Sequence, residues 1–120
     1  MGWIGMDLDG TLASFEPGQN EYVIGAPVPA SMRILRKHLD SGTEVRIFTA
    51  RAADPAQVAL VRAWMEKHGL PNLSITNKKD YDMYKLYDDR AVPIKRNQGP
   101  ALYQTPYQAY FSNILKRKGK

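Results

Sequence analysis

The stretch Asp7-Leu8-Asp9-Gly10-Thr11 is the part of the sequence whose residue types most directly suggest chemistry. It follows a short apolar run, so its two carboxylates can converge where a strand ends and the chain turns at Gly10. Paired carboxylates bind hard cations, and one of them can attack phosphorus while the other transfers a proton. A polar turn or a calcium loop could carry similar letters, but the glutamate that a calcium loop requires is missing.

Thr49 and Arg51 follow a second apolar run, Val45–Phe48. A hydroxyl group beside backbone amides at a strand end can donate to a phosphoryl oxygen, although a threonine there is also a common local cap. Arg51 can bind phosphate through two N–H groups, or it can pair with Asp54 near the start of the next helix. The sequence leaves both choices open.

Two further charged pairs lie in the second half of the chain. Lys78 and Lys79 could supply an ammonium group that offsets the negative charge of a phosphate and its nucleophile, or they could lie in a solvated loop. Asp88 and Asp89 follow another apolar run. Beside the first two acids they would repel one another strongly unless a cation or a lysine lay among them. A surface acidic turn paired with Arg90 is the alternative.

Apolar periodicity and turn signals predict strands that alternate with helices. Strands are expected at residues 2–8, 44–48, 73–75 and 83–87, and helices at residues 29–39, 55–68 and about 105–115. This order predicts an α/β fold with a three-layer, Rossmann-like parallel sheet. Ligands bind at the carboxyl ends of such strands, which is where most of the chemical residues stand.

The chain leaves little room for a second domain. Residues 1–120 are expected to form one domain, with residues 14–27 as a flap or hairpin beyond the first strand. The connections over residues 11–44 and 51–78 are too short to hold a cap domain. The site is therefore expected to be open, or covered by residues 14–27 or by another subunit.

The net charge of +5 is concentrated at the end of the chain, because four of the 17 basic residues lie at positions 116–120 and the others nearly balance the 12 acidic residues. This basic tail could attract nucleic acid, or it could be a solvated terminus. No apolar run is long enough to span a membrane and no signal peptide is visible. The absence of cysteine excludes disulfides and thiolate metal sites. A cytoplasmic protein is expected, and the oligomeric state is not indicated.

Taken in order, these groups resemble the four motifs of the haloacid dehalogenase (HAD) superfamily of phosphotransferases. An apolar strand followed by Asp-x-Asp-x-Thr matches Met6–Thr11, and a strand ending in Thr matches Val45–Thr49. The lysine motif falls at Lys78 or Lys79, and the acidic pair falls at Asp88-Asp89. The resemblance extends over roughly residues 3–95. In closer detail, Lys79-Asp80-Tyr81 followed by Tyr87–Val92 resembles small, uncapped HAD-type hydrolases of phage and bacterial genomes.

The resemblance implies a role for each matching residue. Asp7 would be the nucleophile, Asp9 the acid/base, and Thr49 and Lys79 would hold the phosphoryl group, with Lys78 as the second choice of lysine. It implies Mg²⁺ as the cofactor, held by Asp7 and Asp89, by the backbone carbonyl of Asp9, and with help from Asp88. The substrate-binding residues would be Gly10, Thr11, Ala50, Arg51 and Lys78.

These expectations favour a magnesium-dependent hydrolase that cleaves small phosphomonoesters through an aspartyl-phosphate. A narrower alternative is a phosphatase for nucleotides or nucleic-acid ends, which the basic tail at residues 116–120 would attract. The other alternative is a non-catalytic binding or regulatory module on the same scaffold. The intact set of acids argues against the module.

Overall fold

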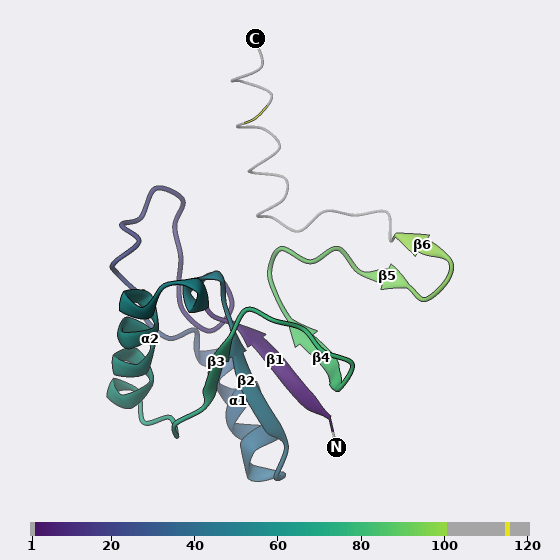
Figure 1. Ribbon diagram of the computed structural model, residues 1–120, viewed down its shortest axis with the longest axis horizontal. Coiled ribbons are helices and arrows are strands. Elements are labelled where there is room, and N and C mark those ends of the chain that lie inside the picture. The colour runs from purple at the N-terminus through teal and green to yellow at the C-terminus, as the bar shows by residue number, and fades with distance from the viewer. Residues whose placement is uncertain (1, 101–114, 116–120) are drawn as a thin grey trace. The chain divides into compact units, whose positions relative to one another are not determined.

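The computed structural model describes residues 2–100 and Leu115. The helix expected at about residues 105–115 and the basic tail at residues 116–120 lie outside the described residues, apart from Leu115. The elements run in the order β1, α1, β2, a 3₁₀ helix η1, α2, β3, β4, β5 and β6 (Figure 1). The expected alternation of strands and helices is present over the first 87 residues.

Four parallel strands form the main sheet, in the order β3-β2-β1-β4 (Figure 1). The strands are β1 (Trp3–Asp7), β2 (Glu44–Phe48), β3 (Ser74–Thr76) and β4 (Met83–Tyr87). The central strand β1 is apolar throughout except for its last residue, as expected for a strand covered on both faces. Its Met6 lies beside Ile47 of β2 and Tyr87 of β4, so the carboxyl ends of the three strands are level with one another.

Both long helices pack on the same face of this sheet. The first, α1 (Pro29–Asp40), contributes Met32 and Leu35, and the second, α2 (Pro55–Lys67), contributes Val61, Trp64 and Met65 to one buried cluster. The sheet side chains of that cluster are Ile4, Met6, Val45 and Ile47, which alternate along β1 and β2 and therefore point the same way. Proline stands at the first position of each helix, where its missing N–H is not needed.

The opposite face carries no helix among the residues that the structure describes, so the expected third layer is not seen there. The connection from β3 to β4 spans only residues 77–82, which is too short for a helical crossover. Part of this connection lies over Trp3, which is 1% exposed. The indole N–H of Trp3 donates to Asp80 (2.8 Å), and the Arg46 guanidinium lies 4.3 Å from the ring centroid. A loop thus covers the start of β1.

The chain divides after Tyr87 into two compact units. The first unit, residues 1–87, holds the parallel sheet and its helices. The second begins at Asp88 and contains a small antiparallel hairpin, β5 (Ile94–Lys95) and β6 (Gly99–Pro100). The described residues of this hairpin pair only with each other, which is why it is separate from the sheet. Among the residues that the structure describes, no helix has the length and apolar character to cross a membrane.

Candidate functional site

The turn after β1 fixes the first two acids. Asp7 ends the strand, and Gly10 adopts φ +87°, a left-handed conformation that favours glycine. The Gly10 N–H donates to the Ala13 carbonyl (2.8 Å), and the Ala13 N–H donates to the Leu8 carbonyl (2.9 Å). Leu8 is fully buried, so the turn is anchored in the core between the two acids. The Asp9 side chain keeps 19% of its surface exposed. The sequence therefore places both acids, half-buried, in a turn that is closed by backbone hydrogen bonds.

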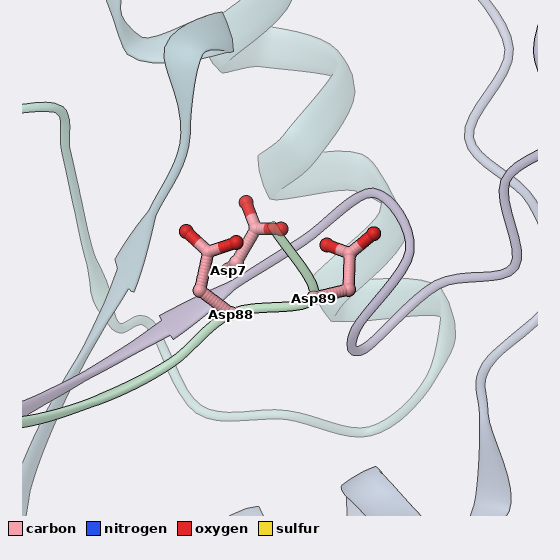
Figure 2. A group of neighbouring side chains, drawn as sticks. All are labelled: Asp7, Asp88 and Asp89. Atoms are coloured by element: carbon pink, nitrogen blue, oxygen red, sulfur yellow. The ribbon is translucent and has the colours of Figure 1, made fainter. Parts of the chain in front are cut away.

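Three carboxylates gather where β1 and β4 end. One oxygen each of Asp7, Asp88 and Asp89 lies within 4.8 Å of the others (Figure 2). Because Tyr87 pairs with Met6, the residues that directly follow β4 come level with Asp7. The Thr11 hydroxyl donates to the Asp7 carboxylate over 3.4 Å, and the Asp88 carboxylate accepts the backbone N–H of Arg90 (2.8 Å). All three acids are partly buried.

The donor set fits a hard divalent cation. Mg²⁺ holds oxygen ligands at about 2.1 Å, so ligands on opposite sides of the ion are about 4.2 Å apart. The three carboxylate oxygens lie within 4.8 Å of one another, which is close to this span. Three negative charges this close also repel one another unless a cation lies among them. The residues present therefore suit Mg²⁺, which prefers a few carboxylates and completes its shell with water and substrate oxygens.

Thr49 lies beside this edge, one residue after β2. Phe48, the last residue of β2, pairs with Asp7, and the Thr49 N–H continues the sheet by donating to the Thr76 carbonyl (2.9 Å). Thr49 is 3% exposed, and its hydroxyl oxygen accepts the backbone N–H of Arg51 (3.2 Å). This bond starts the 3₁₀ helix η1 (Ala50–Ala53). The expected alternative, a local cap, is thus present, and the hydroxyl hydrogen is still available to an acceptor.

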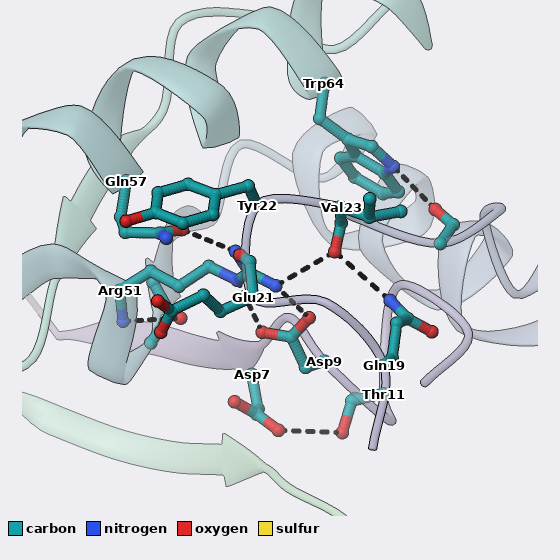
Figure 3. A network of polar contacts seen from close by, with 12 residues as sticks. Asp7, Asp9, Thr11, Gln19, Glu21, Tyr22, Val23, Arg51, Gln57 and Trp64 are labelled. Carbon is teal, nitrogen blue, oxygen red and sulfur yellow. Dashed lines mark hydrogen bonds and ion pairs between the residues drawn. The ribbon is translucent and has the colours of Figure 1, made fainter. Parts of the chain in front are cut away.

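Arg51 takes a different place from the expected phosphate ligand (Figure 3). Its Nε and Nη2 atoms donate to the two carboxylate oxygens of Asp9, over 2.8 and 3.0 Å. Nη1 donates to the Glu21 carbonyl and to the Gln57 side chain, and Nη2 also donates to the Val23 carbonyl (3.2 Å). A guanidinium has five N–H donors, so all five are used within the protein. Arg51 thus links Asp9 to residues 14–27 and has no spare donor for a phosphate in this arrangement. The expected alternative partner of Arg51, Asp54, caps α2 by accepting the Ala56 N–H (2.9 Å).

Residues 14–27 form a loop that returns on itself beside the turn. The Ser14 N–H donates to the Ala26 carbonyl (2.8 Å), and Ala13 makes an antiparallel bridge with Pro27. Gly25 is required at the base, because a Cβ atom there would lie 2.1 Å from the Ser14 carbonyl oxygen. The Trp64 indole N–H donates to the Gly25 carbonyl (2.8 Å) and so ties the loop to α2. Residues 14–27 contain no strand, so a loop closed by one isolated bridge lies where a flap or hairpin was expected.

A pocket of about 410 Å³ lies between this loop, the turn and the start of α2. Asp9 and Arg51 form part of its wall, together with Phe15, Gln19, Glu21, Ala50, Asp54 and Gln57. A cavity of this size suits a small ligand. Among the described residues, the structure thus brings together on one edge of the sheet most of the expected site residues, and it adds a pocket that the sequence did not reveal.

The two lysines are not equivalent. Lys79 is exposed and lines a different pocket with Asp80 and Tyr81. Asp80 is bound to Trp3, at the opposite end of β1 from Asp7, so the preference for Lys79 is not supported by its position. Lys78 is also exposed, but its backbone N–H donates to the Thr76 hydroxyl (3.0 Å), which places the residue at the carboxyl end of β3. Lys78 is therefore the better placed of the two.

Sequence reasoning gave no functional role to Gln57 or to Glu21. Gln57 stands where a capping-box partner is expected, but its side-chain oxygen accepts a hydrogen bond from Arg51 instead, and the residue is 7% exposed. The one available signal was a polar residue in the first turn of a helix close to the second motif. Glu21 stands in a loop, where the sequence carries no comparable signal.

No family model matches the sequence, and no curated protein matches it. A solved structure of a conserved protein from Bacteroides thetaiotaomicron is similar to this chain, with a TM-score of 0.54 and 18% identity. The similarity covers 96% of this chain and 89% of that protein. At this identity the likeness concerns the fold, which is an α/β arrangement around a parallel sheet.

Proposed function

We propose that this protein is a magnesium-dependent hydrolase of phosphomonoesters in which Asp7 is the nucleophile. The observation that carries the proposal is the group of Asp7, Asp88 and Asp89 carboxylates at the adjoining ends of β1 and β4. Asp9 follows on the same turn, and Thr49 follows the neighbouring strand. The order of these motifs, and their resemblance to the HAD superfamily, support the same reading.

Asp7, Asp88 and Asp89 would hold Mg²⁺, with the backbone carbonyl of Asp9 as the further ligand that the resemblance implies. When bound, the ion offsets the negative charge of the carboxylates and of the phosphoryl oxygens, so that an anionic nucleophile and an anionic substrate can meet. A calcium loop is a poorer explanation, because the acids here come from two strand ends and not from one continuous loop.

The protein's own groups then divide the reaction into two steps. In the first, an Asp7 oxygen bonds to phosphorus while the ester P–O bond breaks, and Asp9 gives a proton to the departing alcohol oxygen. In the second, water attacks the same phosphorus while the bond between phosphorus and the Asp7 oxygen breaks, Asp9 takes up a proton from that water, and inorganic phosphate leaves. Both Asp9 carboxylate oxygens accept from Arg51, so Asp9 has to release one of these bonds when it gives or takes up a proton.

Thr49 and Lys78 would hold the transferring phosphoryl group. The oxygen of the Thr49 hydroxyl accepts the backbone N–H of Arg51, so the hydroxyl hydrogen can be donated to a phosphoryl oxygen of the substrate. An ammonium group at Lys78 would lie on the β3 side of the site, opposite the acids contributed by β4. Such donors act in the transition state, where the phosphoryl oxygens carry the most charge.

The proposal is tested with Asp7→Asn and with Asp40→Asn as a matched control. Asp40 is exposed at the end of α1, far along the chain from the acids of the site. Phosphate release from a panel of monoesters is measured with Mg²⁺ and after chelation by EDTA. We expect wild type and Asp40→Asn to turn over only with Mg²⁺, and Asp7→Asn to lose turnover by at least about 10³-fold while its thermal unfolding stays cooperative.

A second measurement tests Mg²⁺ binding independently of phosphate release. Isothermal titration of Mg²⁺ should show weaker binding to Asp89→Asn than to wild type and Asp40→Asn. Phosphate release by Asp7→Asn at the wild-type rate, or equal Mg²⁺ affinity in all variants, would refute the assignment. An absence of turnover in wild type across the whole panel would instead favour a binding module on this scaffold.

A further inference from the structure

The pocket beside Asp9 lies where the alcohol part of a phosphomonoester would sit. It lies between the turn that carries Asp9, the 14–27 loop and the start of α2, and Asp9 itself is part of its wall. A group that gives its proton to the departing oxygen must lie next to that oxygen. If Asp7 attacks phosphorus, the leaving group is therefore directed toward this pocket.

The charge of the pocket restricts what it can receive. Glu21 and Asp54 add two carboxylates to that of Asp9, while Arg51 is the one cationic side chain in the wall. All five N–H groups of that guanidinium already donate within the protein, two of them to Asp9. The pocket thus has an excess of negative charge and no free cationic donor. A second phosphate there would meet carboxylates with nothing to bind it.

The remaining wall residues suit a ring that carries hydroxyl or amino groups. Phe15 offers a half-buried aromatic face, against which a sugar or a base can stack. Gln19, Glu21 and Asp54 carry oxygens that accept hydrogen bonds from hydroxyl or amino groups. The volume of about 410 Å³ is in the range of pockets that hold one small ligand.

We propose that this pocket selects the leaving group, and that the substrate is a monophosphate ester of a small ring alcohol that is otherwise neutral or positively charged. The proposal rests on the function proposed above and narrows it. It disfavours bisphosphates and nucleic-acid ends, because a neighbouring phosphate would enter the acidic pocket. Glu21 is the specificity-determining residue that is best suited to a test, because its side chain lines the pocket while its backbone makes the contact with Arg51.

The test compares pairs of substrates that share one ring. Turnover of adenosine 5′-monophosphate is compared with that of adenosine 3′,5′-bisphosphate, and glucose 6-phosphate with glucose 1,6-bisphosphate. We expect kcat/KM to favour the monophosphate by about 10-fold or more in each detectable pair, from repulsion by the exposed Glu21 and Asp54 carboxylates. Glu21→Lys should reduce this preference by about 5-fold or more, and raising the salt concentration should reduce it in wild type.

Glu16→Lys is the matched control, because Glu16 is exposed in the same loop but does not line the pocket. It should leave the preference unchanged. Wild type that hydrolyses the bisphosphates equally well, or an equal change in Glu16→Lys and Glu21→Lys, would overturn the inference.

A binding measurement keeps this inference separate from the proposed function. Saturation-transfer NMR with adenosine and with glucosamine, in EDTA, reports binding of the alcohol part without metal or turnover. We expect a signal with wild type that is lost with Phe15→Ala. No turnover of any monoester would refute the proposed function, whereas no binding of either ring compound to wild type would refute the pocket's role.

Discussion

Replacement of Arg51 by Met should destabilise the protein strongly, because this side chain binds three other parts of the chain. Its five donors reach Asp9 on the turn, Glu21 and Val23 in the loop, and Gln57 on α2. The side chains of Arg51 and Asp9 are 10% and 19% exposed, so their ion pair is shielded from water but not fully buried. Methionine retains much of the apolar stem and removes all five bonds.

The size of the effect follows from this burial. Removing one partner of a fully buried pair costs about 3–5 kcal/mol, and an exposed pair contributes about 0–1 kcal/mol. The partial exposure of Asp9 places the loss between these limits, at about 2–3 kcal/mol. For a domain of this size, that corresponds to a fall in Tm of roughly 8–20 °C. Arg36→Met is the control, since Arg36 is exposed and makes one bond, to the His68 carbonyl (3.0 Å); it should cost at most about 0.5 kcal/mol.

A double-mutant cycle isolates the pair itself. Urea unfolding of wild type, Asp9→Asn, Arg51→Met and the double variant gives the coupling free energy between the two side chains. We expect a coupling of about 1–3 kcal/mol, because either single change leaves the other charge without its main partner. Additive effects in the cycle, or an Arg51→Met loss no larger than that of Arg36→Met, would refute this role of Arg51.

Three further predictions concern other contacts. Gly25→Ala should lower the free energy of unfolding by about 2–3 kcal/mol, since its Cβ would lie 2.1 Å from a backbone oxygen. Gly18→Ala in the same loop is the control: its Cβ meets no atom within 4 Å, and it should cost about 1 kcal/mol because of the positive φ. Equal losses for the two variants in urea unfolding would contradict this prediction. The hydrogen bond from the Trp3 indole holds the pKa of Asp80 below its ordinary value of 3.8, so its contribution to stability is present above that pH and is lost as the pH falls below it. Wild type should therefore exceed Asp80→Asn in stability near neutral pH and converge with it in acid, and a difference that does not shrink would count against the bond. Lys78→Met should lower kcat/KM by about 100-fold while Lys79→Met changes it by less than about 3-fold, and the reverse order would restore Lys79 as the active-site lysine.

Local properties of the sequence predicted the elements of the sheet well. Strands at residues 44–48 and 83–87 were expected and are present with the same bounds, because alternating or continuous apolar residues between turn signals are local patterns. The helix that begins at Pro55 was expected from Asp54 as its cap, and the Asp54 carboxylate does accept the Ala56 N–H. The strand predicted at residues 73–75 is displaced by one residue, which is within the usual uncertainty of element ends.

Long-range contacts decided what local patterns could not. Among the described residues, a loop at residues 77–82 lies on the face opposite the two helices, where its Asp80 accepts the Trp3 indole N–H, and only the packed chain shows this. The compact unit that begins at Asp88 is likewise defined by contacts, because its hairpin pairs with itself.

By itself, the sequence determined that acids stand at the ends of β1 and β4, since residue order fixes which side chain follows each strand and Gly10 fixes the turn. The tertiary structure decided that all five N–H donors of Arg51 bind within the protein. Its acceptors come from positions up to 42 residues away in the chain, and no local pattern encodes them. The fold likewise decided the negative charge of the pocket, because only packing brings Glu21 and Asp54 to the same wall.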